Sequence, residues 1–327
     1  MKMRAAVLSL LLVALLALAS LAAAKTTRVS VQEPEPKASP SPSPAPVAET
    51  ASDPGEEEVR GAFLTTRPKA ADRPAASDTA TKPSHRRPKT VAKKNPPKGG
   101  IDSGAKVDSS DAKDNTTQSR LGLGMTLFMR DSNGLAVRVD PNHDFRKGDQ
   151  VRVLLETNAD GYLYIFNTTD NGAPVMRYPD VQLDEGGNFM KSHVPFEIPS
   201  SLEEEERLRW FTFDKRAGVE RLYFVFTREP IKDVPIEDEL IKFCGENKRE
   251  CEWRPASQLW SSLQKEMESP TRSSNSRKFG KAQTVNEQEA TTRGLGLAKE
   301  DAEPTMVIMT ASSGPSILVA ALELVHK

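Results

Sequence analysis

The sequence has few of the residues that build catalytic and metal sites. Its 327 residues include two Cys and four His, and aromatic residues make up 6% of the chain. There is no Gly-x-Ser-x-Gly motif, and no glycine-rich loop is followed by Lys and Ser or Thr. These are the patterns of a nucleophile elbow and of a phosphate-binding loop. We therefore expect no enzymatic activity and no cofactor.

The histidines do not form a cluster along the chain, since they lie in unrelated segments: His85, His143, His193 and His326. Only the run from Asp140 to Asp144 combines a base with carboxylates. Such a loop could bind a cation. Asp-Pro-Asn is also ordinary turn chemistry, and we favour the turn. The sequence therefore predicts no metal site.

Long apolar runs are missing except at the start of the chain. Lys2 and Arg4 precede the apolar residues 5–19, and the segment closes on three alanines at 22–24. This is the pattern of a signal peptide, so we expect residues 1–24 to be cleaved after Ala24. The alternative is an uncleaved anchor, because residues 5–24 are about long enough to cross a bilayer. With no later apolar run, we expect a periplasmic or extracellular bacterial protein without a transmembrane helix after cleavage.

Residues 25–120 lack the apolar side chains that a core requires. Most of the 24 Pro fall in the first third of the chain, and Phe63 is the only aromatic residue between positions 33 and 118. Burial of so little apolar surface does not offset an ordering entropy of roughly 1 to 2 kcal/mol per residue. The composition predicts a disordered Pro/Ala/Lys-rich tether.

The second half of this tether is basic, with many cations against two Asp: Arg60, Arg67, Lys69, Arg73, Lys82, Arg86, Arg87, Lys89, Lys93, Lys94 and Lys98. Outside the cytoplasm its partner would be an anionic envelope surface. The simpler interpretation is a solvated linker that its charges keep extended. Nucleic acid is an unlikely partner, because no aromatic residues alternate with the cations to stack on bases.

Strand patterns begin near Leu121. Residues 125–130 and 135–139 flank an Asn-Gly turn, and residues 162–166 lead through Asp-Asn-Gly at 170–172 to residues 175–178. Both patterns predict hairpins. Further strands are expected at 151–155, 189–194, 208–213 and 221–227. Short strands joined by turns favour an antiparallel, immunoglobulin-like β-sandwich over residues 121–230.

The C-terminal part alternates apolar and polar segments. A helix is expected from Pro235, with Ile236, Leu240 and Phe243 on one face, and a second helix over residues 256–267. Together they make residues 231–268 a helical segment. Residues 269–292 are polar and predict a flexible insert. Residues 306–309 and 317–324 predict a closing strand pair, so residues 293–327 complete the β domain.

Cys244 and Cys251 are separated by six mostly polar residues within the helical segment. In an oxidising compartment this spacing suits a disulfide. Zinc is not expected, since no His lies near the pair. A redox-active pair usually has two intervening residues.

The aromatic residues provide one hint of a binding surface. Tyr162 and Tyr164 could line a groove for a peptide or glycan, although their alternation favours a place in the core. Trp253 and Trp260 follow the predicted disulfide and are better candidates for an exposed patch. They could equally dock the second helix.

The central part of the chain has a characteristic order of turns and strands. It consists of Phe145 to Val153, Asp160 to Phe166, Asp170-Asn171-Gly172, Tyr178-Pro179-Asp180 and Phe196 to Pro199. It continues through Gly218-Val219-Glu220 to Arg228-Glu229-Pro230. This order resembles a bacterial domain of unknown function, DUF4384, over about residues 124–230. The resemblance implies a bacterial β-sandwich with no established activity and no functional residues to carry over.

We therefore expect an exported, non-catalytic binding or scaffolding module of the cell envelope, whose partner is an envelope protein or a glycan. Attachment to an anionic envelope surface through the basic tether is the first alternative. A hydrolase or metal-dependent enzyme with residues that do not group in sequence is the second.

Overall fold

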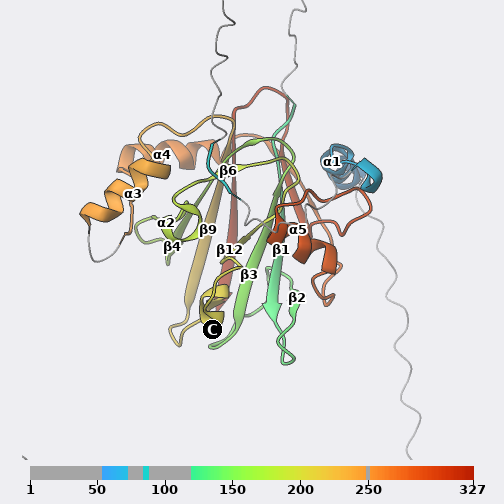
Figure 1. Cartoon of the computed structure of the whole chain (residues 1–327), viewed down its shortest axis with the longest axis horizontal. Coiled ribbons are helices and arrows are strands. Elements are labelled where there is room, and N and C mark those ends of the chain that lie inside the picture. Colours follow the sequence, from blue (N-terminus) through green and yellow to red (C-terminus); the bar gives the residue numbers. More distant parts are fainter. Residues whose placement is uncertain (1–53, 73–83, 88–118, 248–250) are drawn as a thin grey trace, which may run out of the picture. The chain divides into compact units, whose positions relative to one another are not determined.

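Two antiparallel sheets form the framework of the computed structural model (Figure 1). The structure describes residues 54–72, 84–87, 119–247 and 251–327, so the expected signal peptide lies outside it. Sheet A has the strand order β10-β11-β1-β3-β7, with β2 beside β1 and β8 beside β3. Sheet B has the order β12-β9-β4-β5, with β6 beside β4. The predicted mainly β class, with antiparallel sheets and short helices, is confirmed.

The elements follow one another in this order: α1 (Pro54–Thr65), η1 (Ala70–Asp72), β1 (Gly122–Arg130), β2 (Ala136–Arg138), β3 (Gln150–Thr157), β4 (Gly161–Thr169), β5 (Val175–Tyr178), α2 (Val181–Asp184), β6 (Phe189–Met190), β7 (Phe196–Ile198), η2 (Glu206–Arg209), β8 (Phe211–Thr212), β9 (Gly218–Thr227), α3 (Glu237–Glu246), α4 (Ser257–Glu266), β10 (Thr271–Asn275), α5 (Val285–Arg293), β11 (Met306–Thr310) and β12 (Ile317–His326).

The main core lies between the sheets and follows the two-residue period of the strands. Val151, Val153 and Leu155 of β3 enter it from sheet A. From sheet B, Leu163 and Ile165 of β4 enter together with alternate residues of β9 and β12. The alternation seen in the sequence therefore places one face of each strand in the shared core.

The strands β4 and β9 are buried on their second face as well. Tyr164 and Phe166 of β4 and Val225 of β9 point away from the main core into a second apolar cluster. That cluster is closed by residues of α3 and α4, including Leu240 and Leu263. Apolar side chains on both faces indicate a central strand covered on both sides, and both strands are central here.

Both predicted hairpins form. Strand β1 pairs with β2 across a turn in which Gly134 has φ of 81°. Strand β4 pairs with β5 across a turn in which Asp170 and Asn171 have φ of 49° and 59°. Residues with short polar side chains tolerate these left-handed conformations better than others. Turn chemistry therefore predicted the two connections correctly.

The predicted tether contains structured residues, and for them the prediction of disorder is wrong. Helix α1 lies against sheet A, with Val59 and Phe63 buried against Val307 and Met309 of β11. A Cβ atom at Gly122 of β1 would lie 2.9 Å from the ring of Phe63. The lone aromatic residue of the segment thus has a complementary site on the sheet, which composition does not reveal.

The insert at residues 269–292 also differs from the prediction. Strand β10 pairs with β11 along the edge of sheet A, and α5 follows it. Helix α5 begins at a capping box in which the side chains of Thr284 and Glu287 bond to each other's backbone N–H groups. This Thr-x-x-Glu pattern is a helix start signal that stabilises a short polar helix.

The two C-terminal strands form where expected but do not pair with each other. Strand β11 joins β1 and β10 in sheet A, whereas β12 pairs along its whole length with β9 in sheet B. The Ser-Gly-Pro segment between them therefore connects the two sheets. The predicted closing pair is corrected to one strand in each layer.

The helices α3 and α4 fall close to their expected positions. Helix α3 starts two residues after Pro235, and its predicted apolar face packs on sheet B through Leu240 and Phe243. None of the described helices combines the length and the apolar character that crossing a bilayer requires.

Candidate functional site

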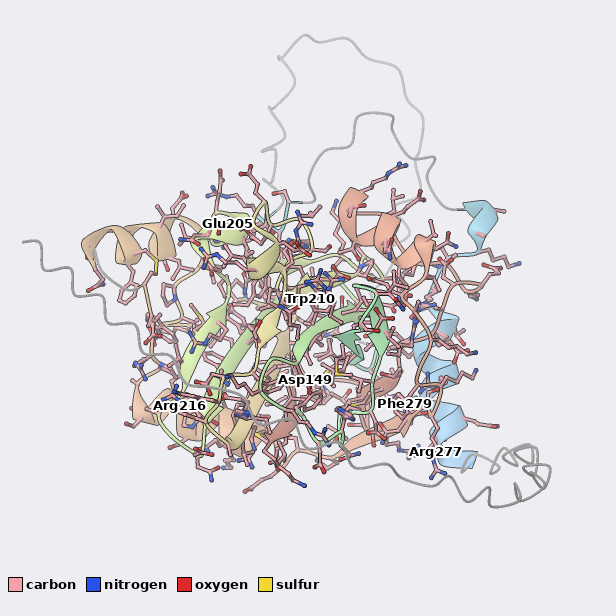
Figure 2. The ribbon with its side chains drawn as sticks, turned by 90° about the horizontal axis from the view of Figure 1, so that it is seen from below. Asp149, Glu205, Trp210, Arg216, Arg277 and Phe279 are labelled. Atoms are coloured by element: carbon pink, nitrogen blue, oxygen red, sulfur yellow. A yellow bond between two sulfur atoms is a disulfide. The ribbon has the colours of Figure 1, made fainter. Side chains whose placement is uncertain are left out.

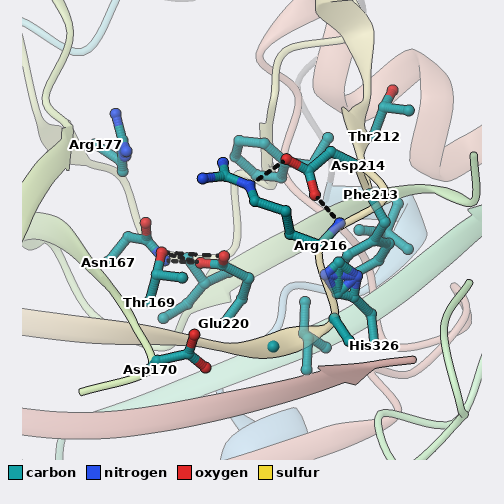
Figure 3. A pocket seen from close by; sticks show the side chains of 16 residues that line it. Asn167, Thr169, Asp170, Arg177, Thr212, Phe213, Asp214, Arg216, Glu220 and His326 are labelled. Carbon is teal, nitrogen blue, oxygen red and sulfur yellow. Dashed lines mark hydrogen bonds and ion pairs between the residues drawn. The ribbon is translucent and has the colours of Figure 1, made fainter. Parts of the chain in front are cut away.

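A pocket with a volume of about 550 Å³ opens between the two sheets at the end of the sandwich (Figure 3). Strands β4, β9 and β12 of sheet B line one side, and β3, β8 and the loop 213–217 line the other. Figure 2 views the molecule from below Figure 1, the side on which the C-terminus lies, and labels Arg216 of this loop. Small-molecule sites have volumes of this order, so the pocket is large enough for a compact ligand.

The floor of the pocket is apolar. Val151 and Leu324 are core residues that also line the pocket, and Phe211 and Phe213 line it from the segment that enters the loop. The ring of Phe213 stacks on that of Phe145, with 4.9 Å between centroids. Rings held by core packing give the pocket a fixed apolar surface.

Two carboxylates of the pocket already accept hydrogen bonds. Glu220 of β9 accepts from the Thr169 hydroxyl at 3.0 Å and from the Asn167 amide at 2.9 Å. Asp170 accepts from the backbone N–H of Val219 at 2.9 Å. These bonds orient both acids along the wall formed by β4 and β9.

The remaining charged groups lie at the rim. The backbone N–H of Arg216 donates to Asp214 at 2.7 Å and the Arg216 Nε at 3.0 Å. These hydrogen bonds hold the pKa of the Asp214 carboxyl below its usual range. Arg177 of β5 lies 3.5 Å from Glu252. Water screens such exposed ion pairs, which contribute little free energy. A ligand could therefore replace one residue of either pair at little cost in free energy.

His326, at the end of β12, is the polar group of the pocket that lacks a partner. Its side chain is 6% exposed and packs against Phe213, with 5.0 Å between the ring centroids (Figure 3). Its Nδ1 atom is buried, and no described residue forms a hydrogen bond with it. A buried polar atom without a partner is unfavourable by about 1 to 3 kcal/mol. A ligand that reaches Nδ1 would remove that penalty.

A second polar constellation lies on the outer face of sheet A. His193 Nε2 is 2.8 Å from the Thr66 hydroxyl, and His193 Nδ1 is 2.7 Å from Glu156. A hydroxyl, a histidine and a carboxylate in a row have the connectivity of a hydrolytic triad. However, the Thr66 hydroxyl donates to the Phe63 carbonyl at 2.7 Å, and Nε and Nη2 of Arg67 donate to the two carboxylate oxygens of Glu156.

The surroundings of this row indicate a structural role. Arg67 and His193 are each 2% exposed, and Arg67 also donates to three backbone carbonyls in residues 298–302. Thr66, His193 and Glu156 do not line the large pocket. The row therefore attaches the end of α1 to β3 and to the loop before β11.

The four aromatic residues singled out in the sequence lie between sheet B and the helices α3 and α4. Tyr162 and Tyr164 are buried, and the Tyr164 hydroxyl accepts from the backbone N–H of Ile231 at 3.0 Å. Trp253 and Trp260 are half-buried, and both contact the ring of Phe166. All four belong to one apolar cluster, and none of them lines the large pocket.

The predicted disulfide is present. Cys244 in α3 is bonded to Cys251, and their Cα atoms are 4.8 Å apart. The bond connects α3 to the segment that carries Trp253 and then enters α4. It therefore constrains the two helices that cover sheet B.

The run at residues 140–144 is a turn, as favoured. Asp140 accepts from the backbone N–H of Asn142 at 2.9 Å, and the ring of His143 packs on that of Phe145. Among the described residues, no group of three or more His, Cys, Asp or Glu is arranged to hold a metal ion.

Sequence reasoning did not find the pocket, because its walls come from segments more than 100 residues apart. His326 lies at the end of an apolar strand, where an isolated His gives no sign of a binding site. The end of β12 projects it into the space between the sheets, and no motif in the sequence marks that position.

Residues 144–230 match the family model described as a domain of unknown function, DUF4384. The chain therefore contains a DUF4384-like domain, as the resemblance predicted. The match covers β3 to β9 and most of the pocket wall, whereas β1, β12 and α3 to α5 lie outside it. No curated protein and no solved structure matches the chain.

Proposed function

We propose that this protein is an exported, non-catalytic binding module of the bacterial cell envelope, and that the pocket at the end of the sandwich receives its ligand. The observation that carries the proposal is the pocket itself, with its volume of about 550 Å³, its apolar floor and the buried His326 Nδ1, which has no hydrogen-bond partner among the described residues. Apolar walls with a few placed polar groups are typical of binding sites.

The lining indicates the chemistry of the ligand. Phe211, Phe213 and Leu324 favour a compact apolar group such as an aromatic ring, and His326 Nδ1 favours one hydrogen-bonding atom on it. The acids Glu220 and Asp170 already accept hydrogen bonds, so they shape the wall more than they attract a cation. In this proposal the ligand is a side chain or terminal group of an envelope protein or glycan.

Two observations support export. The first 24 residues have the pattern of a signal peptide. The Cys244–Cys251 disulfide is a cross-link that persists mainly in oxidising compartments.

The test is a titration of the chain starting at Lys25 with two probes, N-acetyl-phenylalaninamide for a peptide group and N-acetylglucosamine for a glycan. Isothermal calorimetry measures each Kd. We expect one probe to bind and the His326→Phe variant to bind it about tenfold more weakly, since the variant keeps the ring contact but loses the nitrogen. His143→Phe, in an exposed turn, is the control. Failure of both probes, or equal binding by wild type and His326→Phe, would overturn the proposal.

Attachment through the basic tether is a weaker proposal, because several of its cations are used within the chain. Arg67 pairs with Glu156, Arg60 with Glu303, Arg86 with Asp238 and Arg87 with Glu237. An anionic surface would have to compete with these carboxylates. Salt-sensitive retention on vesicles of anionic lipid tests this alternative.

A hydrolytic function is the least supported proposal. Thr66, His193 and Glu156 have the connectivity of a triad, but Arg67 engages the carboxylate and the histidine is buried. If hydrolysis of any ester were found, Thr66→Val would have to abolish it for this row to be its site.

A further inference from the structure

Residues 84–87, Ser-His-Arg-Arg, contact α2, the start of α3 and the residues that lead into β6, and we call the surface that receives them the groove. They form the short teal segment beside β6 in Figure 1. The groove is lined by carboxylates on both sides: Asp184, Glu185, Glu237 and Asp238. It has no part in the pocket described above.

The backbone of the segment contacts Gly187 and Phe189. The N–H of Phe189 in β6 donates to the His85 carbonyl at 2.7 Å. A Cβ atom at Gly187 would lie 2.7 Å from the carbonyl carbon and oxygen of His85. Only glycine at position 187 permits this approach, so the groove can receive the backbone of the segment at close range.

The His85 side chain is held in an enclosed place. His85 is 7% exposed, its ring forms a hydrogen bond with Asp184 through Nδ1, and it meets the ring of Phe196 edge-on with 5.0 Å between centroids. A carboxylate and an aromatic edge on one ring select an imidazole over an aliphatic side chain.

The side chains of Arg86 and Arg87 and the backbone N–H of Arg87 bind to carboxylates. Arg86 donates to Glu185 at 2.9 Å and to Asp238 at 2.5 Å. The backbone N–H of Arg87 donates to Glu237 at 2.6 Å, and its guanidinium lies 3.3 Å from the same carboxylate. Three consecutive residues thus have separate partners, and the backbone bends at Arg86 between them.

We propose that this groove is a peptide-binding site for a short basic peptide with His followed by two Arg, presented by a partner protein, and that residues 84–87 are the chain's own competitor for it. Attachment to the same chain gives the internal segment an effective concentration in the millimolar range. A partner peptide therefore binds when it exceeds that concentration or when additional contacts favour it.

The experiment empties the groove and returns the ligand as a separate molecule. In the chain starting at Lys25, the triple variant His85→Ala, Arg86→Ala, Arg87→Ala leaves all groove residues unchanged. A fluorescein-labelled peptide with the sequence of residues 83–89 is titrated by fluorescence anisotropy into this variant and into the wild type. A scrambled peptide of the same composition controls for charge alone.

We expect the triple variant to bind the peptide at least about tenfold more tightly than the wild type, whose groove is occupied. The scrambled peptide should bind more weakly than the native one. Gly187→Ala in the triple background should abolish binding, whereas Gly245→Ala, where an added Cβ meets no atom within 4 Å, should leave it unchanged. Asp184→Asn is a second groove variant with an unchanged backbone, and unfolding curves report whether each variant is folded.

Absence of binding by the triple variant, or equal binding of native and scrambled peptides, would overturn the proposal. So would unchanged binding by both folded groove variants, Gly187→Ala and Asp184→Asn. Self-association of the wild type that the triple variant abolishes would support the site and identify a second copy of the chain as the source of the peptide.

Discussion

The helices that cover sheet B pack against aromatic and aliphatic side chains, whereas the segments that cover sheet A combine a smaller apolar cluster with buried ion pairs. On sheet B, Leu240 and Leu263 close over the rings of Tyr164 and Phe166. On sheet A, Arg67, which follows α1, pairs with Glu156 of β3, and Glu287 of α5 pairs with Arg138 of β2. Most of these covering segments lie outside the matched residues 144–230.

The difference shows two ways of fixing a covering element on a sheet. Apolar contacts are non-directional and scale with the buried area. Buried ion pairs contribute little net stability, because desolvation offsets their attraction, but removal of one partner is strongly unfavourable. For sheet A we therefore infer that the buried ion pairs determine the positions of α1 and α5. They contribute less to the free energy that holds these helices on the sheet.

The largest effect is expected on sheet A. Glu156→Ala leaves the buried Arg67 and His193 without their carboxylate, and should lower the free energy of unfolding by about 3 to 5 kcal/mol. Urea denaturation measures it. Glu58→Ala removes an exposed partner of Arg272 and should change stability by less than about 1 kcal/mol.

The same pair permits a sharper test. Replacement of both Arg67 and Glu156 by Met should restore most of the lost stability, since apolar residues can replace a buried ion pair at little cost. A double variant no more stable than Glu156→Ala would contradict this account of sheet A.

Removal of a buried apolar side chain from the helices that cover sheet B should lower the free energy of unfolding. Leu240→Ala removes a side chain that is 2% exposed and should lower the free energy of unfolding by about 3 kcal/mol. Its neighbour Ile241, 38% exposed, provides the matched control, and Ile241→Ala should cost less than about 1 kcal/mol. Similar losses for both variants would show that α3 is not held by its buried face.

The disulfide should stabilise only the helices that cover sheet B, α3 and α4. Replacement of Cys244 and Cys251 by Ser opens a short loop and should lower stability by about 2 kcal/mol in the chain-entropy account. Hydrogen exchange should rise in α3 and α4 and not in α1. Equal loss of protection in α1 would contradict the separation of the two covers.

The smallest effect concerns the core that both sheets share. The Tyr178 hydroxyl is buried, and none of the residues that the structure describes forms a hydrogen bond with it, so Tyr178→Phe should change stability little or raise it. Burial raises the pKa of Tyr178 well above its ordinary value of about 10. Above that pH the unfolded chain loses protons that the folded chain keeps, so stability falls as pH rises.

Tyr178→Phe should therefore flatten the alkaline loss of stability, measured as unfolding midpoints between neutral pH and pH values above about 10. Tyr164, whose pKa is also raised by burial, would retain part of that loss. If stability falls with rising pH as steeply in the variant as in the wild type, the alkaline loss of stability does not come from Tyr178.

Much of the sandwich could be predicted because strands and turns are local. The period of two in β3 places Val151, Val153 and Leu155 together in the shared core, and the apolar residues on both faces of β4 and β9 indicate burial on both sides. The second face of β3 is also buried, although it carries the charged residues Arg152 and Glu156. Turn residues at 131–134 and 170–172 predicted the hairpins, and residue spacing predicted the disulfide. Helix α5 could have been predicted as well, because its capping box is written in Thr284 and Glu287.

The candidate sites could not be predicted, because each joins residues that are far apart in the chain. His326 meets the loop at 213–217 only once β12 pairs with β9 and the sheets stack. His85 meets Asp184 only across a groove that Gly187 leaves open.

The sequence by itself determined the strand pattern, the turns, the disulfide and the resemblance of its central part to DUF4384. Only the tertiary structure decided that Phe63 and Arg67 of the Pro-rich segment belong to the fold, and which sheet each C-terminal strand joins. The physical reason is the distance along the chain over which each interaction acts. Periodicity and turn preference involve only a few consecutive residues. A buried ion pair or an orphaned nitrogen exists only after distant segments have met.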